Sequence, residues 1–105
     1  MVACTTFTQL ALSMPDAVEE PHFEKRSFRI KKKIFATLDE KNKRAVLKFS
    51  AIDQSVFCSM APQAIYQVEN SWGKQGWTMV DLQLVDEEVM KDAIAVAYST
   101  VLGKR

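Results

Sequence analysis

The most constraining feature of this sequence is a regular alternation of apolar and polar residues over positions 28–49. A period of two is the pattern of a β-strand with one buried face. Two short polar connections interrupt the alternation, and the strands that it predicts are residues 28–30, 34–38 and 45–49. Because connections this short join neighbouring antiparallel strands, the run predicts a three-stranded meander.

The central strand of this meander carries apolar residues at nearly every position. Successive Cβ atoms of a strand point to opposite faces of the sheet. Ile34, Ala36 and Leu38 therefore share one face, whereas Phe35 and Thr37 share the other. We expect the first three side chains in the core and Phe35 on the opposite face.

The residues before the meander show helical periodicity. Their apolar stripe, spaced i, i+3, i+4 and i+7, consists of Phe7, Leu10, Ala11 and Met14. This spacing places the apolar side chains on one face of a helix. Thr5 or Thr6 is the expected N-cap and Pro15 the expected stop.

Two further helices are expected after the meander. The capping-box pattern Ser50-Ala51-Ile52-Asp53 opens the first, and Pro62 closes it. Asp86 caps the second, and Gly103 ends it, with Lys104 and Arg105 favourable at its negative end. The predicted buried stripes are Ile52, Val56, Phe57 and Met60 in the first, and Met90, Ala93, Ile94, Ala97 and Val101 in the second.

Two more strands complete the predicted sheet. Residues 65–68 are rich in β-branched and aromatic side chains, and residues 78–84 alternate. The order α-β(3)-α-β(2)-α places helices against an antiparallel sheet, which is the α+β class. At 105 residues the chain is predicted to form one domain, residues 1–105.

Both tryptophans and two of the three glycines fall within the segment Trp72-Gly73-Lys74-Gln75-Gly76-Trp77. Two glycines three residues apart indicate a shaped loop, and the indoles give it large flat surfaces. Such a loop is either locked into a core or presented to a partner. We expect Trp77 to begin the last strand and pack against a helix, with Gly76 avoiding a clash. For Trp72, burial and exposure both remain open.

Charge is segregated along a chain whose net charge is only +1. Residues 24–48 hold ten Lys and Arg against three acidic residues, whereas both flanking parts are weakly acidic. Such a block indicates either an anionic partner or a solvated hairpin face. We expect the two connections of the meander to lie next to each other and to contact phosphates together. The basic residues on and near these connections are Lys25, Arg26, Arg29, Lys31, Lys32, Lys33, Lys41, Lys43 and Arg44.

Several classes of function lack support in the sequence. Cys4 and Cys58 do not form a disulfide framework, and we expect them to be small core residues in a reducing compartment. No signal peptide and no long apolar run is present, which predicts a cytoplasmic protein without a membrane partner. His22 is the only histidine, and no nucleotide-binding or nucleophile motif occurs. We therefore expect no catalysis, no metal and no cofactor.

Six short segments make the chain resemble a known family. They are Leu12-Ser13-Met14-Pro15, Glu20-Pro21-His22-Phe23, Ser27-Phe28-Arg29, Lys33-Ile34-Phe35-Ala36-Thr37-Leu38, Ala45-Val46-Leu47-Lys48 and Trp72-Gly73-Lys74-Gln75-Gly76-Trp77. On these segments the chain resembles the MmcQ/YjbR-like proteins, small bacterial domains of unknown function. The last segment is the most specific. One departure is that Glu24-Lys25-Arg26 follows Phe23 where the family often has Gly-Lys-Pro, so we expect the turn there to differ from that of the family.

The resemblance implies an α-β(3)-α-β(2)-α fold, similar to those of frataxin-like proteins and type III secretion chaperones. It also implies DNA binding through a double wing of β-hairpins. If the family has a ligand pocket, its polar lining would be His22, Lys33, Lys48 and Trp77. Iron binding of the frataxin kind is not expected, because the first helix has no acidic residue before Asp16 to supply oxygen ligands.

The function that we predict is sequence-tolerant binding of DNA or RNA by the lysine-rich hairpins, with Trp72 stacking on bases beside Lys74. The alternatives are a protein-interaction adaptor or a small-ligand-binding module, acting as a monomer or weak homodimer. An exposed patch of Phe28, Phe35, Tyr66 and Trp72 away from the lysines would favour a protein partner. Lysines and aromatics interleaved on one face would favour nucleic acid.

Overall fold

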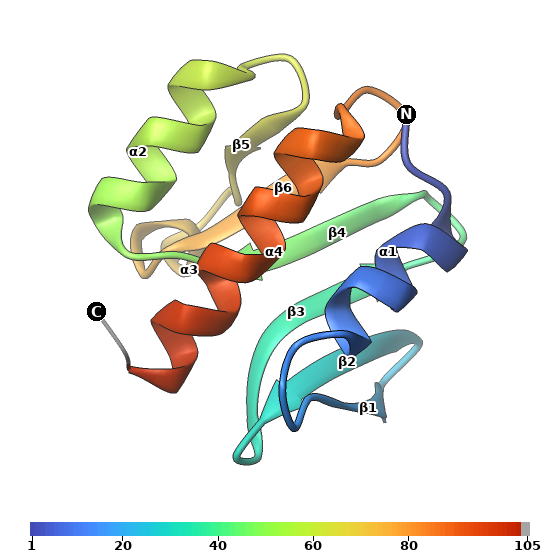
Figure 1. The fold of residues 1–105 in the computed structure, drawn as a ribbon. Helices are drawn as coiled ribbons and strands as arrows, with labels where there is room; N and C mark the ends of the chain where they lie inside the picture. Colours follow the sequence, from blue (N-terminus) through green and yellow to red (C-terminus); the bar gives the residue numbers. More distant parts are fainter. Residues whose placement is uncertain (104–105) are drawn as a thin grey trace.

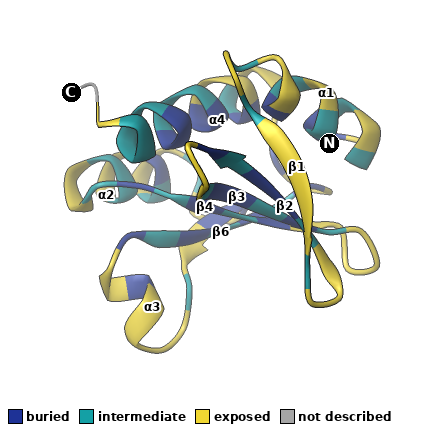
Figure 2. Cartoon of the chain, turned by 90° about the horizontal axis from the view of Figure 1, so that it is seen from below, coloured by how far each residue is buried: buried dark blue, intermediate teal, exposed yellow. Residues whose placement is uncertain are grey.

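Three helices cover one face of an antiparallel sheet in a computed structural model that describes residues 1–103 (Figure 1). The elements are α1 (Cys4–Leu12), β1 (Val18–His22), β2 (Lys25–Ile30), β3 (Lys33–Asp39), β4 (Arg44–Lys48), α2 (Ala51–Met60), β5 (Ile65–Gln67), α3 (Ser71–Lys74), β6 (Trp77–Asp81) and α4 (Glu87–Leu102). The strand order is β1-β2-β3-β4-β6-β5. Helices α1, α2 and α4 lie on one side of the sheet and α3 on the other (Figure 2). The predicted α+β class is confirmed.

The sequence does not predict two of these elements, β1 and α3. Strand β1 contains Pro21 and is almost wholly exposed at the edge of the sheet (Figure 2). Proline is tolerated at an edge because a missing N–H costs no ladder hydrogen bond there. Helix α3 is a single turn within the Trp/Gly segment, and the side chain of Asn70 caps it by accepting a hydrogen bond from the Trp72 N–H at 2.8 Å.

A β-bulge in β3 reverses the expected facing of two side chains. The pairs Phe28–Ala36 and Arg29–Ile34 leave Phe35 with no residue opposite it. The extra residue shifts the alternation by one position. Phe35 is therefore fully buried and packs edge-on against Tyr98, with ring centroids 5.6 Å apart. The prediction was wrong for Ile34, which is only partly buried and lies on the opposite face.

The core lies between the sheet and the three covering helices. Phe7 of α1 meets Phe28 edge-on at 5.7 Å, and Phe49 stacks on Phe57 of α2 at 4.9 Å. The predicted stripe of α4 is buried, except that Val101 is only partly so. Cys4 and Cys58 are free thiols that pack partly buried against this core.

The helix ends follow the predictions only in part. Ser50 caps α2 by accepting a hydrogen bond from the Asp53 N–H, and Gly103 ends α4 with a φ of 85°. Asp86 is the N-cap residue of α4 but makes no side-chain cap hydrogen bond. The predicted cap of α1 was wrong, because Thr5 and Thr6 lie inside the helix and Ala3 precedes it. Lys104 and Arg105 lie outside the described residues.

The predicted buried stripe of α2 was also wrong. Ile52, Val56 and Met60 are 76%, 54% and 54% exposed, and Phe57 is the buried member. The reason is that α2 packs at the edge of the sheet, over the short strand β5, so one flank of the helix has nothing to cover it (Figure 1).

Candidate functional site

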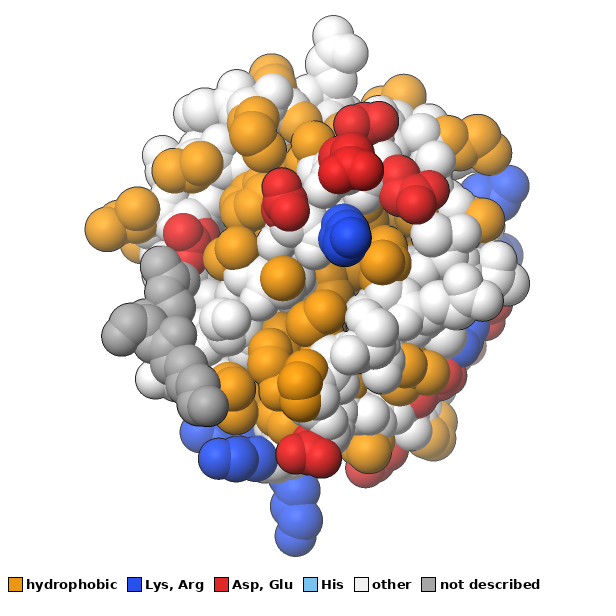
Figure 3. Space-filling view, viewed as in Figure 1, with side chains coloured by type: hydrophobic (Ala, Val, Ile, Leu, Met, Phe, Trp, Pro, Cys, Tyr) orange, Lys and Arg blue, Asp and Glu red, His pale blue; other side chains and the backbone are white. Residues whose placement is uncertain are grey.

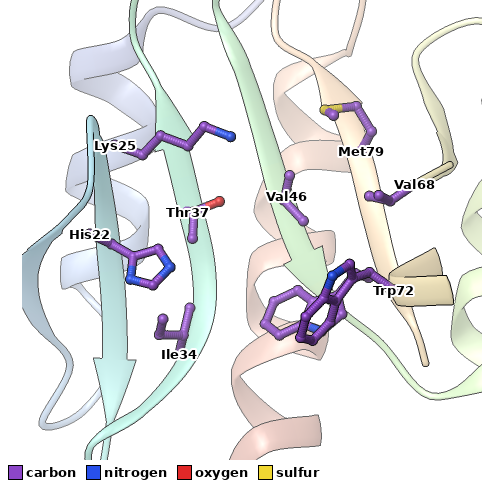
Figure 4. A pocket seen from close by; sticks show the side chains of 9 residues that line it. His22, Lys25, Ile34, Thr37, Val46, Val68, Trp72 and Met79 are labelled. Carbon is purple, nitrogen blue, oxygen red and sulfur yellow. The ribbon is translucent and has the colours of Figure 1, made fainter. Parts of the chain in front are cut away.

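We call the face of the sheet that α1, α2 and α4 do not cover the open face. A hollow of about 450 Å³ lies on this open face (Figure 4). This volume is within the range of about 300–1,000 Å³ that small-molecule sites occupy. The residues that line the hollow are His22, Lys25, Ile34, Thr37, Val46, Val68, Trp72, Trp77 and Met79. They come from five strands, from α3 and from the segment that precedes it.

The strand register explains why these side chains meet. Val46 of β4 lies opposite Thr37 of β3 on one side and opposite Met79 of β6 on the other. His22 of β1 lies opposite Lys25 of β2. Directly opposed residues of antiparallel strands point to the same face. In Figure 4 the side chains from β1, β2 and β3 stand on one side of the hollow, and Trp72 stands on the other.

The Trp/Gly segment reaches the open face because its glycines allow two very close backbone approaches. A Cβ atom on Gly73 would lie 1.9 Å from the Val68 carbonyl oxygen, and one on Gly76 would lie 1.9 Å from the Phe49 carbonyl oxygen. Gly76 also has a φ of 106°, and its carbonyl accepts a hydrogen bond from the Phe49 N–H. These approaches hold α3 under the end of the sheet.

The two indoles of this segment line the same hollow. Trp77 begins β6 as predicted, but it lies on the open face and not against α1, α2 or α4, because Thr78 and Val80 occupy the core side. The Nζ atom of Lys48 lies 5.6 Å from the Trp77 ring centroid and donates a hydrogen bond to the Gln75 carbonyl. Trp72 is 56% exposed, which leaves its ring available to a ligand.

Sequence reasoning assigned no site role to Ile34, Thr37, Val46, Val68 or Met79, which line the hollow. It also missed Phe23, which lies beside the hollow. Phe23 lies at the tip of the β1–β2 hairpin, is 93% exposed, and packs edge-on against the His22 ring at 4.8 Å. Its φ of 61° is rare for a bulky side chain. The one available signal is the segment that follows Phe23, which departs from the Gly-Lys-Pro pattern of the resembled family.

The basic residues do not form the single cluster that the sequence suggested. The turn at Lys31 and Lys32 lies at one end of β3 and the connection containing Lys41 and Lys43 at the other (Figure 1). Successive hairpins of a meander turn at alternate ends, and the seven residues of β3 separate them by about 20 Å. Their predicted adjacency was wrong. Seen from the helix side, most Lys and Arg side chains lie at the margins (Figure 3).

Some of the predicted basic residues form ion pairs with acidic side chains of this chain, and the others do not. Arg26 donates two hydrogen bonds to Glu19, at 2.5 and 2.8 Å, and lies 3.3 Å from Glu40. The hydrogen bond from Arg26 holds the pKa of Glu19 below its ordinary value. Arg29 lies 3.8 Å from Glu20. Within residues 1–103, the predicted basic residues without an ion pair are Lys25, Lys31, Lys32, Lys33, Lys41, Lys43, Arg44, Lys48 and Lys74.

The structure brings together part of the pocket that the resemblance implied. His22 and Trp77 line the hollow, and Lys48 lies at its rim against Trp77. Lys33 pairs with Ile30 at the β2–β3 hairpin and does not line the hollow. No group of three or more His, Cys, Asp or Glu residues within positions 1–103 is arranged to hold a metal ion.

Comparison with known proteins identifies the family. A family model described as YjbR matches residues 12–100. The chain belongs to the YjbR family. The crystal structure of the Deinococcus radiodurans protein DR2400, which carries a DUF419 domain, matches with a TM-score of 0.85 over 99% of this chain and 81% of that chain. At 21% identity this likeness shows that the two share the fold.

One comparison found no match, and the helices of the structure bear on a separate question, membrane insertion. No curated protein matches this member of the YjbR family. None of the helices within residues 1–103 is long and apolar enough to cross a membrane.

Proposed function

We propose that this YjbR-family protein binds nucleic acid with little regard to sequence, and that it does so on the open face of the sheet. The observation that carries this proposal is the interleaving of cations and aromatics there. Lys25 and Lys48 lie beside the tryptophan-lined hollow, and Lys74 follows Trp72 on α3. Lysines neutralise phosphates without reading sequence, and exposed indoles stack on any base.

The positions of the other aromatics favour nucleic acid over a protein partner. Phe28 and Phe35 are fully buried, so they cannot join Tyr66 and Trp72 in an exposed aromatic patch. Trp72, the most exposed of the four, lies in the hollow with Lys25. The proposal therefore moves the main contact from the lysine-rich hairpins to the open face.

The proposed function involves no catalysis. A nucleophilic cysteine requires a thiolate, and thiolates form where positive groups lower the pKa. Burial instead raises the pKa of the Cys58 thiol. This supports a structural role for Cys58 in a binding protein.

The test is a titration of labelled single-stranded DNA, duplex DNA and RNA over a series of salt concentrations. The open-face variant is Lys25→Glu/Lys74→Glu, and its matched control is Lys31→Glu/Lys32→Glu, which changes net charge equally. We expect affinity to fall linearly with salt on logarithmic axes, and the open-face variant to flatten the single-strand slope by about 1.4 for two lost phosphate contacts. The control should change the slope less.

Two results would count against this function. Equal effects of the two variants would remove the open face as the main contact. No binding by the unchanged protein at the lowest salt concentration would remove nucleic acid as the ligand.

A protein-interaction adaptor remains the second candidate, favoured by one observation. Ile52, Val56 and Met60 are spaced every four residues along α2 and are all more than half exposed. Apolar side chains also appear over this part of the surface in Figure 3. Sedimentation over a concentration series tests its simplest form, self-association, which Ile52→Glu/Met60→Glu should abolish.

A further inference from the structure

We propose that the hollow takes one unstacked nucleobase of a single strand, with Trp72 as its stacking surface and the His22–Phe23 pair on the opposite side. This inference rests on the proposed function. It adds that the ligand is a single strand and that one of its bases occupies the hollow. A planar heteroaromatic ring flanked by phosphates is the chemistry that the lining fits. A free nucleotide shares this chemistry, and the experiment below separates the two sources.

The lining combines an apolar floor with free polar groups. Val46 of β4 lies between Thr37 on one side and Trp72 on the other, and the apolar side chains of Ile34 and Met79 also line the hollow (Figure 4). Within the described part of the chain, neither the Thr37 hydroxyl nor the His22 ring makes a hydrogen bond. Flat apolar surfaces bind the faces of a ring, and unpaired polar groups are available to its edge.

The tip of the β1–β2 hairpin supplies an independent indication. His22 and Lys25 are paired, so Phe23 and Glu24 form a two-residue loop with a positive φ at its first position. This is the pattern of a type II′ turn, in which glycine is preferred there. Phe23 instead places a large ring in water beside the hollow. Backbone strain that no burial offsets is a reason to infer a binding role.

The geometry favours a single strand over a duplex. A base in a duplex must be extruded before it can enter a pocket, whereas an unpaired base enters without that cost. Lys25 lies at the hollow on β2 and Lys74 on α3. Cations on both sides of the base can contact the phosphates that precede and follow it. These contacts distinguish a strand from a free nucleotide.

The experiment compares a thymidine dodecamer, a duplex of equal length and free thymidine monophosphate at one salt concentration. We expect the single strand to bind at least about tenfold more tightly than the duplex, and the free nucleotide to bind more weakly than the strand. Trp72→Ala should weaken single-strand binding about 5- to 150-fold. Trp72→Phe, which keeps an aromatic ring, should restore most of the affinity. Phe23→Gly should also weaken single-strand binding although it relieves the turn.

The matched control is Tyr66→Ala, because Tyr66 is 38% exposed but does not line the hollow. We expect it to leave single-strand affinity within about twofold, as for an aromatic that stacks on no base. Binding that is equal for strand and duplex and unchanged in Trp72→Ala would overturn this inference and leave the proposed function standing. Equally tight binding of thymidine monophosphate would overturn the assignment to a strand. No binding of any of these three ligands, and none of RNA in the salt titration above, would remove both proposals.

Discussion

The three glycines of this chain allow two costs of an added methyl group to be measured separately. An alanine Cβ at position 76 would meet both a positive φ of 106° and the Phe49 carbonyl oxygen at 1.9 Å. At position 73 it would meet only a close contact, the Val68 carbonyl oxygen at 1.9 Å. At position 103 it would meet only a positive φ of 85°, with no atom within 4 Å.

The expected losses in the free energy of unfolding follow from these contacts. A left-handed φ costs an L-residue about 1–2 kcal/mol, and a forced overlap with the backbone costs about 1–3 kcal/mol. Gly76→Ala should therefore lose about 2–5 kcal/mol and Gly103→Ala about 1 kcal/mol. Gly73→Ala should lose about 1–3 kcal/mol, although the same change in an open helix stabilises by about 1 kcal/mol.

Urea unfolding followed by tryptophan fluorescence measures all three variants, and thermal melts provide a second estimate. For a domain of this size, each kcal/mol shifts the melting temperature by about 4–8 °C, so Gly76→Ala should melt at least about 8 °C lower. If Gly76→Ala lost no more than Gly103→Ala, the close approach to Phe49 would not constrain the segment. If Gly73→Ala gained stability, α3 would not pack against Val68, and the position of Trp72 would have to be revised.

Three further predictions concern the sheet. Phe35→Ala should lower the free energy of unfolding by about 3–5 kcal/mol in urea, whereas an outward-facing Phe35 would lose far less. Lys31→Asn/Lys32→Gly should raise the melting temperature by about 5 °C, because both positions have a positive φ and Asn-Gly suits such turns; a lower melting temperature would contradict this. Arg26→Gln should lower the free energy of unfolding at neutral pH. This loss should shrink below pH 4.5, because Glu19 becomes protonated first in the unfolded chain and then in the folded one. A loss of stability that does not change with pH in acid titrations would refute this prediction.

Local patterns in the sequence were sufficient for much of the fold. The alternation over positions 28–49 predicted β2, β3 and β4 in their antiparallel arrangement. The period of about 3.6 residues placed the buried face of α4, whose long stripe crosses the centre of the sheet. The segment 72–77 indicated the family and the importance of its glycines. In each of these cases residues close together in the sequence determine the local structure, so the sequence alone is enough to predict it.

Other features depend on which strands pair and in what register. The bulge at Phe35, the edge position that tolerates Pro21, and the exposed flank of α2 all result from contacts with residues distant in the sequence. The hollow is the strongest case, because His22, Val46 and Trp72 meet only once the sheet has formed. The lysine-rich connections lie far apart for the same reason, since each hairpin reverses the chain and carries the next turn to the opposite end. Elements come from local periodicity, whereas sites that join distant elements come from the pairing of strands.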